Sequence, residues 1–160
     1  MKAVFAAGCF WGVQFYFDQI SGVTATTVGY TGGHTENPSY EEVCTHTTGH
    51  AEALLVEFDP EQVSYQTLVT HFFKMHDPTQ LNRQGPDVGD SYRSAIFYLD
   101  EAQKVAAEAA KAAAAPNFSE PIVTQIAAAS TFYEAEDYHQ KYAERTGRGM
   151  CHIPYEPIAS

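Results

Sequence analysis

The hydrophobic and polar positions in the first half of the chain predict strands interleaved with helices. A short apolar run over 3–7 ends at Gly8, and apolar residues then recur at helical spacing over 10–19. This order is typical of a strand, a tight glycine turn and a helix. The segments Gly22–Tyr30 and Ala51–Asp59 are rich in Val, Thr, Leu and Phe, so we predict that both are strands.

The second half of the chain continues with the same mixture of periods. Ser64 and Asp100 stand at the start of helical patterns, where their side chains can accept hydrogen bonds from unpaired backbone N–H groups. Pro78 and Pro116 follow these patterns and end them. The predicted elements are a helix from Ser64, a polar loop over 77–91, a strand over 94–99, an alanine-rich helix from Asp100, a strand over 122–127, a short helix over 134–142 and an irregular tail.

Length and composition fit a single folded domain. The chain has 160 residues, of which 44% are hydrophobic, and this is enough to bury a core and to exclude global disorder. No repeat or linker divides the sequence. We therefore predict one α+β domain over residues 1–160, with a flexible tail from about residue 143.

The net charge of the chain excludes some classes of binding partner. The net charge of −11 argues against nucleic acid and against an anionic membrane surface as the main partner. No apolar run approaches the roughly 18 residues of a spanning helix, and a strand-like segment follows Met1 directly, so we expect a cytoplasmic protein. Acidic residues but no Lys or Arg occur between Lys2 and Lys74. A carboxyl buried in this stretch is therefore expected to have a raised pKa.

The segment Gly8-Cys9-Phe10-Trp11-Gly12 carries the clearest sign of chemistry. It places a thiol at the start of a predicted helix, where unpaired backbone N–H groups and the helix dipole stabilise a thiolate. A lone cysteine is more often a small buried apolar residue, but the flanking glycines and the turn position favour a nucleophile. Phe10 and Trp11 are then either core residues or the wall of an apolar substrate pocket beside the thiol.

The same segment resembles the signature of the A-type peptide methionine sulfoxide reductases. Further blocks similar to those of this family follow in family order over about residues 5–140: Gly29–Gly33, Tyr40–Cys44, Thr48–Glu52, His76–Gln80, Asn82–Gly85, Tyr92–Ser94 and Ala135–Gln140. Each block is short, but their common order makes the resemblance specific. Ser91 stands where the family pattern has glutamine, so the packing of its loop is not predicted.

The resemblance implies both a fold and an activity. The fold is a two-layer α/β sandwich of ferredoxin-like type, with a mainly antiparallel sheet. The activity is thiol-dependent reduction of the S epimer of methionine sulfoxide, in proteins and as the free amino acid, which repairs oxidative damage. The resemblance also implies an oxidoreductase without a cofactor, which takes electrons from thioredoxin or dithiothreitol. We expect a monomer, although no residue pattern in the sequence fixes the oligomeric state.

The matching positions assign roles to individual residues. Cys9 supplies the nucleophile that attacks sulfur, and Glu52 supplies the proton for the departing oxygen. Tyr40 and Tyr92 donate hydrogen bonds to that oxygen, while Asp87 helps to position the substrate backbone. The plainer alternatives are a surface charge at Glu52, packing roles for the tyrosines and a turn role for Asp87. The otherwise apolar strand around Glu52 weakens the first of these alternatives.

A second thiol would then condense with the sulfenic acid formed on Cys9. Of the three cysteines, Cys44 lies in a block that we expect to be packed, where a small buried apolar residue is typical. Cys151 lies between glycines and prolines in the predicted tail, which can reach the active site without unfolding a strand. Because many family members use cysteines in such a tail, we predict a Cys9–Cys151 disulfide that thioredoxin reduces.

The residues alone leave a metal site and two other classes of protein open. Cys44, His46, His50 and Glu52 could be drawn as a zinc site, but structural zinc usually uses paired cysteines, so we expect no metal. A cysteine with a histidine base would indicate a hydrolase, although we expect His139 to be a hydrogen-bonded structural residue. A small acidic binding module would show no thiol-dependent turnover.

Overall fold

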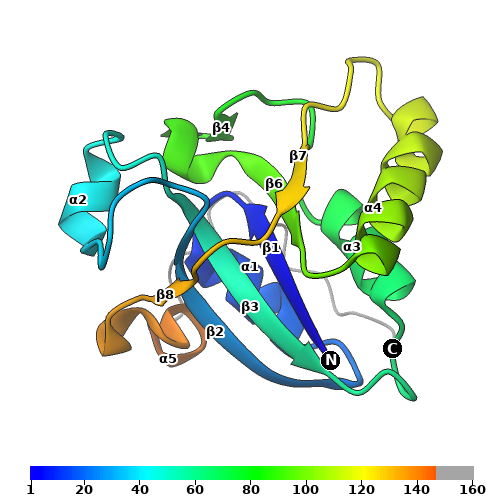
Figure 1. The fold of residues 1–160 in the computed structure, drawn as a ribbon, viewed down its shortest axis with the longest axis horizontal. Helices are drawn as coiled ribbons and strands as arrows, with labels where there is room; N and C mark the ends of the chain where they lie inside the picture. Colours follow the sequence, from blue (N-terminus) through cyan, green and yellow to red (C-terminus); the bar gives the residue numbers. More distant parts are fainter. Residues whose placement is uncertain (147–160) are drawn as a thin grey trace.

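A six-stranded sheet lies at the centre of the computed structural model, which describes residues 1–146 (Figure 1). The strand order is β7-β6-β1-β3-β2-β8, and all neighbours are antiparallel except β6 and β7. The strands are β1 (Lys2–Ala7), β2 (Val23–Thr31), β3 (Ala51–Phe58), β6 (Ser94–Tyr98), β7 (Gln125–Ala128) and β8 (Tyr133–Glu134). The prediction of an α+β domain with a mainly antiparallel sheet is confirmed.

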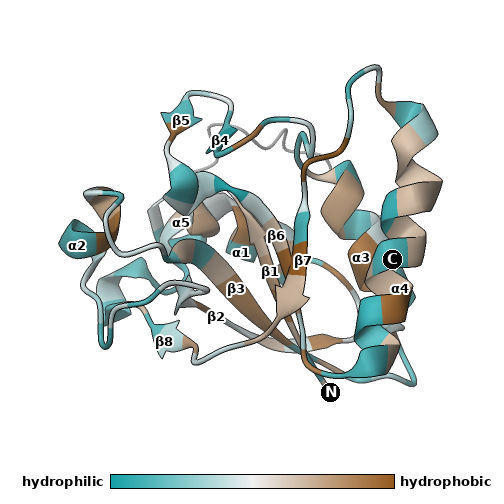
Figure 2. Ribbon diagram, turned by 45° about the horizontal axis from the view of Figure 1, so that its top comes forward, coloured by the Kyte–Doolittle hydropathy of each residue, from teal (hydrophilic) through white to brown (hydrophobic). Residues whose placement is uncertain are grey.

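One face of the sheet is covered by α1 (Phe10–Asp18), α3 (Tyr65–Lys74) and α4 (Glu101–Ala114). Phe5 of β1 joins the two layers, because its ring stacks on Phe17 of α1 and on Phe72 of α3 at centroid distances of 5.3 and 5.5 Å. All three rings are fully buried, and each burial contributes about 1.5–3 kcal/mol. Hydrophobic and hydrophilic residues alternate along α4, which packs alanines on this core (Figure 2).

Both predicted helix caps are present. Ser64 Oγ accepts a hydrogen bond from the N–H of Thr67 at 3.1 Å, and Asp100 Oδ1 accepts one from the N–H of Gln103 at 2.8 Å. These bonds pair donors that the first turn of a helix otherwise leaves unpaired. The predicted strands are also present, although the one expected over 122–127 begins only at Gln125.

Several short elements were not evident from the periodicity of the sequence. They are α2 (Tyr40–Cys44), the hairpin of β4 (Arg83–Gln84) with β5 (Asp87–Val88), and a 3₁₀ helix over Asp90–Tyr92. Elements of two to five residues are shorter than the window in which a period can be recognised. Among residues 1–146 the structure contains no helix with the length and apolar character needed to span a membrane.

The helix predicted over 134–142 is wrong. This segment forms part of β8, then a 3₁₀ helix over Asp137–His139 and the start of α5 (Tyr142–Thr146), which extends into the predicted tail. The reason is tertiary hydrogen bonding: the Gln140 side chain accepts from the N–H of Val28 and donates to its carbonyl oxygen, both at 3.0 Å. These bonds to β2 replace the local bonds of a helix. Cys151 lies outside the described residues.

Candidate active site

Cys9 lies where β1 passes into α1. Gly8 makes the turn with a φ of +93°, a left-handed conformation that glycine adopts without steric strain. Cys9 is then the N-cap residue of α1 and is 8% exposed. The predicted order of strand, glycine turn and helix therefore places this thiol at a helix N-terminus, where a thiolate is stabilised.

Glu52 lies on β3, opposite Tyr30 of β2. Side chains alternate between the two faces of a strand, so Glu52 shares the helix-covered face with Leu54 and Val56. It is 1% exposed, and its Oε1 accepts a hydrogen bond from the N–H of Phe10 at 3.2 Å. The bond ties the carboxyl to the residue that directly follows Cys9.

The environment of Glu52 favours its protonated form. Burial raises the pKa of this carboxyl to about 8, the N–H of Phe10 opposes the rise, and the charge of Asp87 adds to it. Oε2 is buried and has no hydrogen-bond partner among the described residues. The predicted rise in pKa is present, but desolvation causes it more than the surrounding acidic residues do. At pH 7 the carboxyl is therefore able to give up a proton.

Tyr40 and Tyr92 stand on two short elements near this carboxyl. Tyr40 begins α2, and Tyr92 ends the 3₁₀ helix Asp90–Tyr92. Both residues are half-buried, and burial raises the pKa of both hydroxyls, with the charge of Glu52 as the next cause. The hydroxyl of Tyr40 also shares a hydrogen bond with the thiol of Cys44. Both tyrosines are thus neutral at pH 7 and can donate a hydrogen bond.

Glu136 fixes α2 against the sheet, a role that the sequence did not reveal. One carboxylate oxygen accepts from the N–H of Tyr40 at 3.1 Å, and the other accepts from the hydroxyl of Tyr30 at 2.9 Å. A capping box between Ser39 and Glu42 completes the start of this helix. The one available signal was the position of Glu136 within a block that carries the family resemblance.

Aromatic rings surround the start of α1. Phe10 is 1% exposed and lies in the core, 5.7 Å from the ring of Tyr30, whereas Trp11 is partly exposed. Trp11 stacks on Tyr142 at 4.0 Å, and its Nε1 donates to Nδ1 of His139 at 2.9 Å. The expected hydrogen bond of His139 is thus present, and burial lowers the pKa of this imidazole. The indole of Trp11 is held in one orientation beside the thiol-bearing turn.

The segment between β4 and β6 brings the remaining predicted residue to the site. Asp87 lies in β5 and is half-buried, and its charge contributes to the raised pKa values of Glu52 and Tyr92. Ser91 is 1% exposed, and its Oγ lies 3.3 Å from Nδ1 of His46. The small side chain of Ser91 therefore packs against a histidine, which answers the question that its departure from the family pattern raised.

Both ring nitrogens of His50, a residue of the zinc site considered above, form hydrogen bonds within the protein. Its Nδ1 accepts from the N–H of Gly33 at 3.1 Å, so its Nε2 donates to the carbonyl oxygen of Thr35 at 2.7 Å. Within residues 1–146 no group of three or more His, Cys, Asp or Glu side chains is placed to hold a metal ion.

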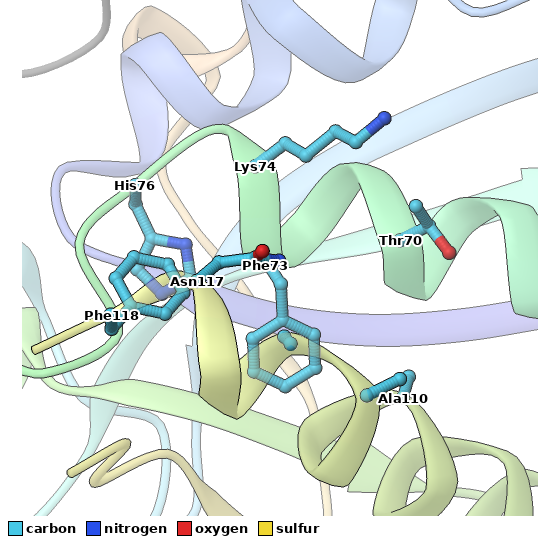
Figure 3. A pocket seen from close by; sticks show the side chains of 9 residues that line it. Thr70, Phe73, Lys74, His76, Ala110, Asn117 and Phe118 are labelled. Atoms are coloured by element: carbon cyan, nitrogen blue, oxygen red, sulfur yellow. The ribbon is translucent and has the colours of Figure 1, made fainter.

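A cavity of about 390 Å³ lies elsewhere, between α3 and α4 (Figure 3). Phe73, Ala110 and Phe118 contribute to its apolar lining. His76 also lines it, but its Nδ1 and Nε2 lie 2.6 Å from the carbonyl oxygen of Phe72 and 2.8 Å from Ser94 Oγ. None of the predicted site residues lines this cavity, so it is separate from the candidate active site.

Comparison with known proteins shows the family to which the chain belongs. A model of the peptide methionine sulfoxide reductase family matches residues 1–160. The peptide methionine sulfoxide reductase MsrA of Methanosarcina acetivorans is 60% identical over 148 residues, which cover 91% of this chain and 79% of that protein. The chain belongs to the peptide methionine sulfoxide reductases, and to their A type.

Solved structures show the same relationship. Methionine sulfoxide reductase A of Corynebacterium diphtheriae matches with a TM-score of 0.88 and 36% identity, over 96% of this chain and 82% of that one. Reduced Mxr1 of Saccharomyces cerevisiae matches with a TM-score of 0.89 and 33% identity, over 93% and 87% of the two chains. The family membership identifies the chain as an oxidoreductase that reduces methionine sulfoxide, not a hydrolase or a binding module.

Proposed function

We propose that this chain reduces the S epimer of methionine sulfoxide, in proteins and as the free amino acid, and so repairs oxidative damage. It acts as a monomer, needs no cofactor and takes electrons from thioredoxin or dithiothreitol. The observation that carries the mechanism is the buried carboxyl of Glu52, whose pKa is about 8 and which accepts the N–H of Phe10, the residue after Cys9. A hydrogen bond from the backbone N–H of Phe10 thus holds the proposed proton donor, Glu52, next to the residue that carries the nucleophile.

The first step transfers oxygen to the thiol. The thiolate of Cys9 attacks the sulfoxide sulfur while Glu52 gives its proton to the sulfoxide oxygen. The hydroxyls of Tyr40 and Tyr92 donate to this oxygen as it gains negative charge. An S–S bond forms between Cys9 and the substrate, and the S–O bond breaks as the protonated oxygen leaves as hydroxide. Hydroxide then attacks Sγ of Cys9 and the S–S bond breaks, so the sulfoxide has gained two electrons and the cysteine has lost two. The products are methionine and a sulfenic acid on Cys9.

Substrate binding uses the surroundings of these groups. Trp11, with Phe10 packed behind it, offers the apolar surface that fits the methyl group on the substrate sulfur. The hydrogen bond and stacking of Trp11 with His139 and Tyr142 hold this surface in place. Asp87 of β5, whose charge acts on Glu52 and Tyr92, positions the backbone of the substrate. The binding site therefore combines one rigid apolar wall with one charged residue.

The second half of the cycle removes the sulfenic acid. The thiol of Cys151 attacks the oxidised sulfur of Cys9, water leaves, and thioredoxin reduces the resulting disulfide. Cys44 is a poorer candidate for this attack, because burial raises the pKa of its thiol and leaves less thiolate. Yeast Mxr1, a structural relative, has been solved in complex with Trx2, which supports thioredoxin as the reductant.

The activity is tested with separated S and R epimers of a methionine sulfoxide peptide and of the free amino acid. We expect methionine to form from the S epimers, with one dithiothreitol oxidised for each methionine. Appreciable turnover of the R epimer alone would contradict the proposal.

The disulfide is tested with Cys151→Ser. This variant should release about one methionine per enzyme in a single turnover but lose thioredoxin-driven cycling. Peptide mapping of the oxidised wild-type enzyme should find Cys9 joined to Cys151. A Cys9–Cys44 bridge, or loss of cycling in Cys44→Ser and not in Cys151→Ser, would make Cys44 the resolving thiol.

A further inference from the structure

His46 has an unusual backbone conformation beside the candidate active site. It follows α2 with a φ of +60°, a left-handed conformation that few residues other than glycine adopt, with asparagine, aspartate and histidine the most frequent among them. Its N–H donates to the carbonyl oxygen of Val43 at 3.0 Å. A residue stays in such a conformation when its surroundings hold it there, so the contacts of the ring indicate what this histidine does.

The ring of His46 meets two side chains of the segment that carries Tyr92. Its Nδ1 lies 3.3 Å from Ser91 Oγ and 3.6 Å from Asp90 Oδ1. Asp90 Oδ1 is buried and has no hydrogen-bond partner among residues 1–146, so the ring of His46 and the guanidinium of Arg93 are the groups that interact with this carboxylate. Ser91 is 1% exposed, which makes its hydroxyl a packing contact and not a nucleophile.

Gly89 makes room for the same ring. A Cβ at this position would lie 2.2 Å from Cε1 of His46, which is closer than side-chain atoms can pack. Gly89 caps the 3₁₀ helix, and its carbonyl oxygen accepts the N–H of Tyr92 at 3.1 Å. The rings of His46 and Tyr92 also meet edge to face, with centroids 6.2 Å apart. The histidine thus packs on the backbone turn and on the ring of Tyr92.

We propose that His46 is a positioning residue that sets the distance between the hydroxyls of Tyr40 and Tyr92. This inference rests on the roles proposed above for the two tyrosines. Tyr40 begins α2 and His46 follows its end, so the imidazole connects the helix of one donor to the turn of the other. Without the ring, the turn of Tyr92 loses its contacts with the segment after α2. A displaced donor stabilises the developing charge on the sulfoxide oxygen less well.

Two substitutions at His46 distinguish the effect of losing the ring from the effect of changing the backbone conformation. His46→Gly removes the ring and suits a φ of +60°, so the fold is expected to remain. His46→Asn also suits this conformation and keeps a side chain that can bond to Ser91. Asn37→Gly is the matched control, because Asn37 is exposed, also has a positive φ of 45° and lies outside this cluster.

The test is a double-mutant cycle with Tyr92→Phe, using the S epimer and excess dithiothreitol. We expect His46→Gly to lower kcat about tenfold with KM within about twofold, because the affected hydrogen bond forms fully only in the transition state. His46→Asn should recover part of this loss, and Asn37→Gly should match the wild type. In the Tyr92→Phe background, His46→Gly should change kcat by less than about twofold, since the two residues act as one unit.

A full tenfold loss from His46→Gly in the Tyr92→Phe background would overturn the inference, because the histidine would then act without this tyrosine. Wild-type kcat in His46→Gly would also overturn it. A wild-type enzyme that fails to reduce the S epimer would instead contradict the proposed function. The two failures are therefore distinguishable within one set of measurements.

Discussion

The two sides of the candidate active site are built in different ways. Cys9 and Glu52 stand next to the centre of the sheet, at the end of β1 and on β3, and the N–H of Phe10 links the second to the first. Tyr40 and Tyr92 instead stand on helices of five and three residues. Helices this short are not stable by themselves. They depend on side-chain contacts from other parts of the chain.

The two pairs of residues therefore differ in how firmly the fold holds them. Cys9 and Glu52, the proposed nucleophile and proton donor, take their geometry from strands most of whose residues are buried, so little can move them. Tyr40 and Tyr92, the proposed hydroxyl donors, depend on contacts of Glu136 and His46, which are single side chains. We call Cys9 and Glu52 the sheet side of the site, and Tyr40 and Tyr92 with the residues that hold them the loop side. Changes on the sheet side should therefore abolish the reaction, and changes on the loop side should weaken it by degrees.

The largest effect is expected for Cys9→Ser. Serine lacks both the acidity and the redox chemistry of a thiol, so turnover should fall to background while the fold is kept. Methionine formation and near-UV circular dichroism measure the two properties. Residual activity near that of the wild type would remove Cys9 from the mechanism.

Glu52→Gln tests the other residue of the sheet side. The amide cannot supply a proton, so kcat should fall by about 10²–10⁴ while substrate still binds. Glu57→Gln is a control on the same strand but on its other face, and it should behave like the wild type. If KM rises and kcat stays unchanged in Glu52→Gln, Glu52 positions the substrate and does not protonate it.

The pH dependence of kcat/KM tests the same role of Glu52 as proton donor. Burial raises the pKa of Glu52 to about 8, so the carboxyl is protonated below this pH and loses its proton above it. In the wild type kcat/KM should therefore decline above about pH 8, approaching tenfold per pH unit. An identical decline in the residual activity of Glu52→Gln would assign this limb to another group.

The loop side is tested with Glu136→Gln, for which we expect a smaller effect. The amide oxygen can still accept from the N–H of Tyr40, but the bond with Tyr30 must reverse, and both bonds become neutral ones, which are weaker than bonds to a carboxylate. We expect kcat/KM to fall about tenfold and the free energy of unfolding to fall by about 1–3 kcal/mol. Enzyme kinetics and urea unfolding provide the two values.

Glu134→Gln, two residues away on an exposed position, is the control for Glu136→Gln and should show neither loss. A loss of 10² or more in kcat/KM from Glu136→Gln would contradict the comparison, because the loop side would then be as sensitive as the sheet side.

The sheet side was also the more predictable one. The position of Cys9 follows from a local order of strand, glycine and helix, and Glu52 stands out as a charge in an apolar strand. The loop side depends on contacts between residues far apart in the chain. Glu136 lies 96 residues from Tyr40, and Gln140 lies 112 residues from Val28, so no local pattern shows these bonds. The same long-range bonds explain why the helix predicted over 134–142 does not form.

The register between β2 and β3 decides whether Glu52 lies on the same face of the sheet as the thiol. Glu52 pairs with Tyr30, and its neighbours Ala51 and Ala53 belong to the opposite face. A shift of one residue would exchange these faces, so the acid would leave the thiol and an alanine would take its place. The same shift would move Leu54 and Val56 out of the core, so a chain that misplaced the acid would also lose its packing. The pairing that gives the sheet its stability is therefore the pairing that brings the acid to the thiol.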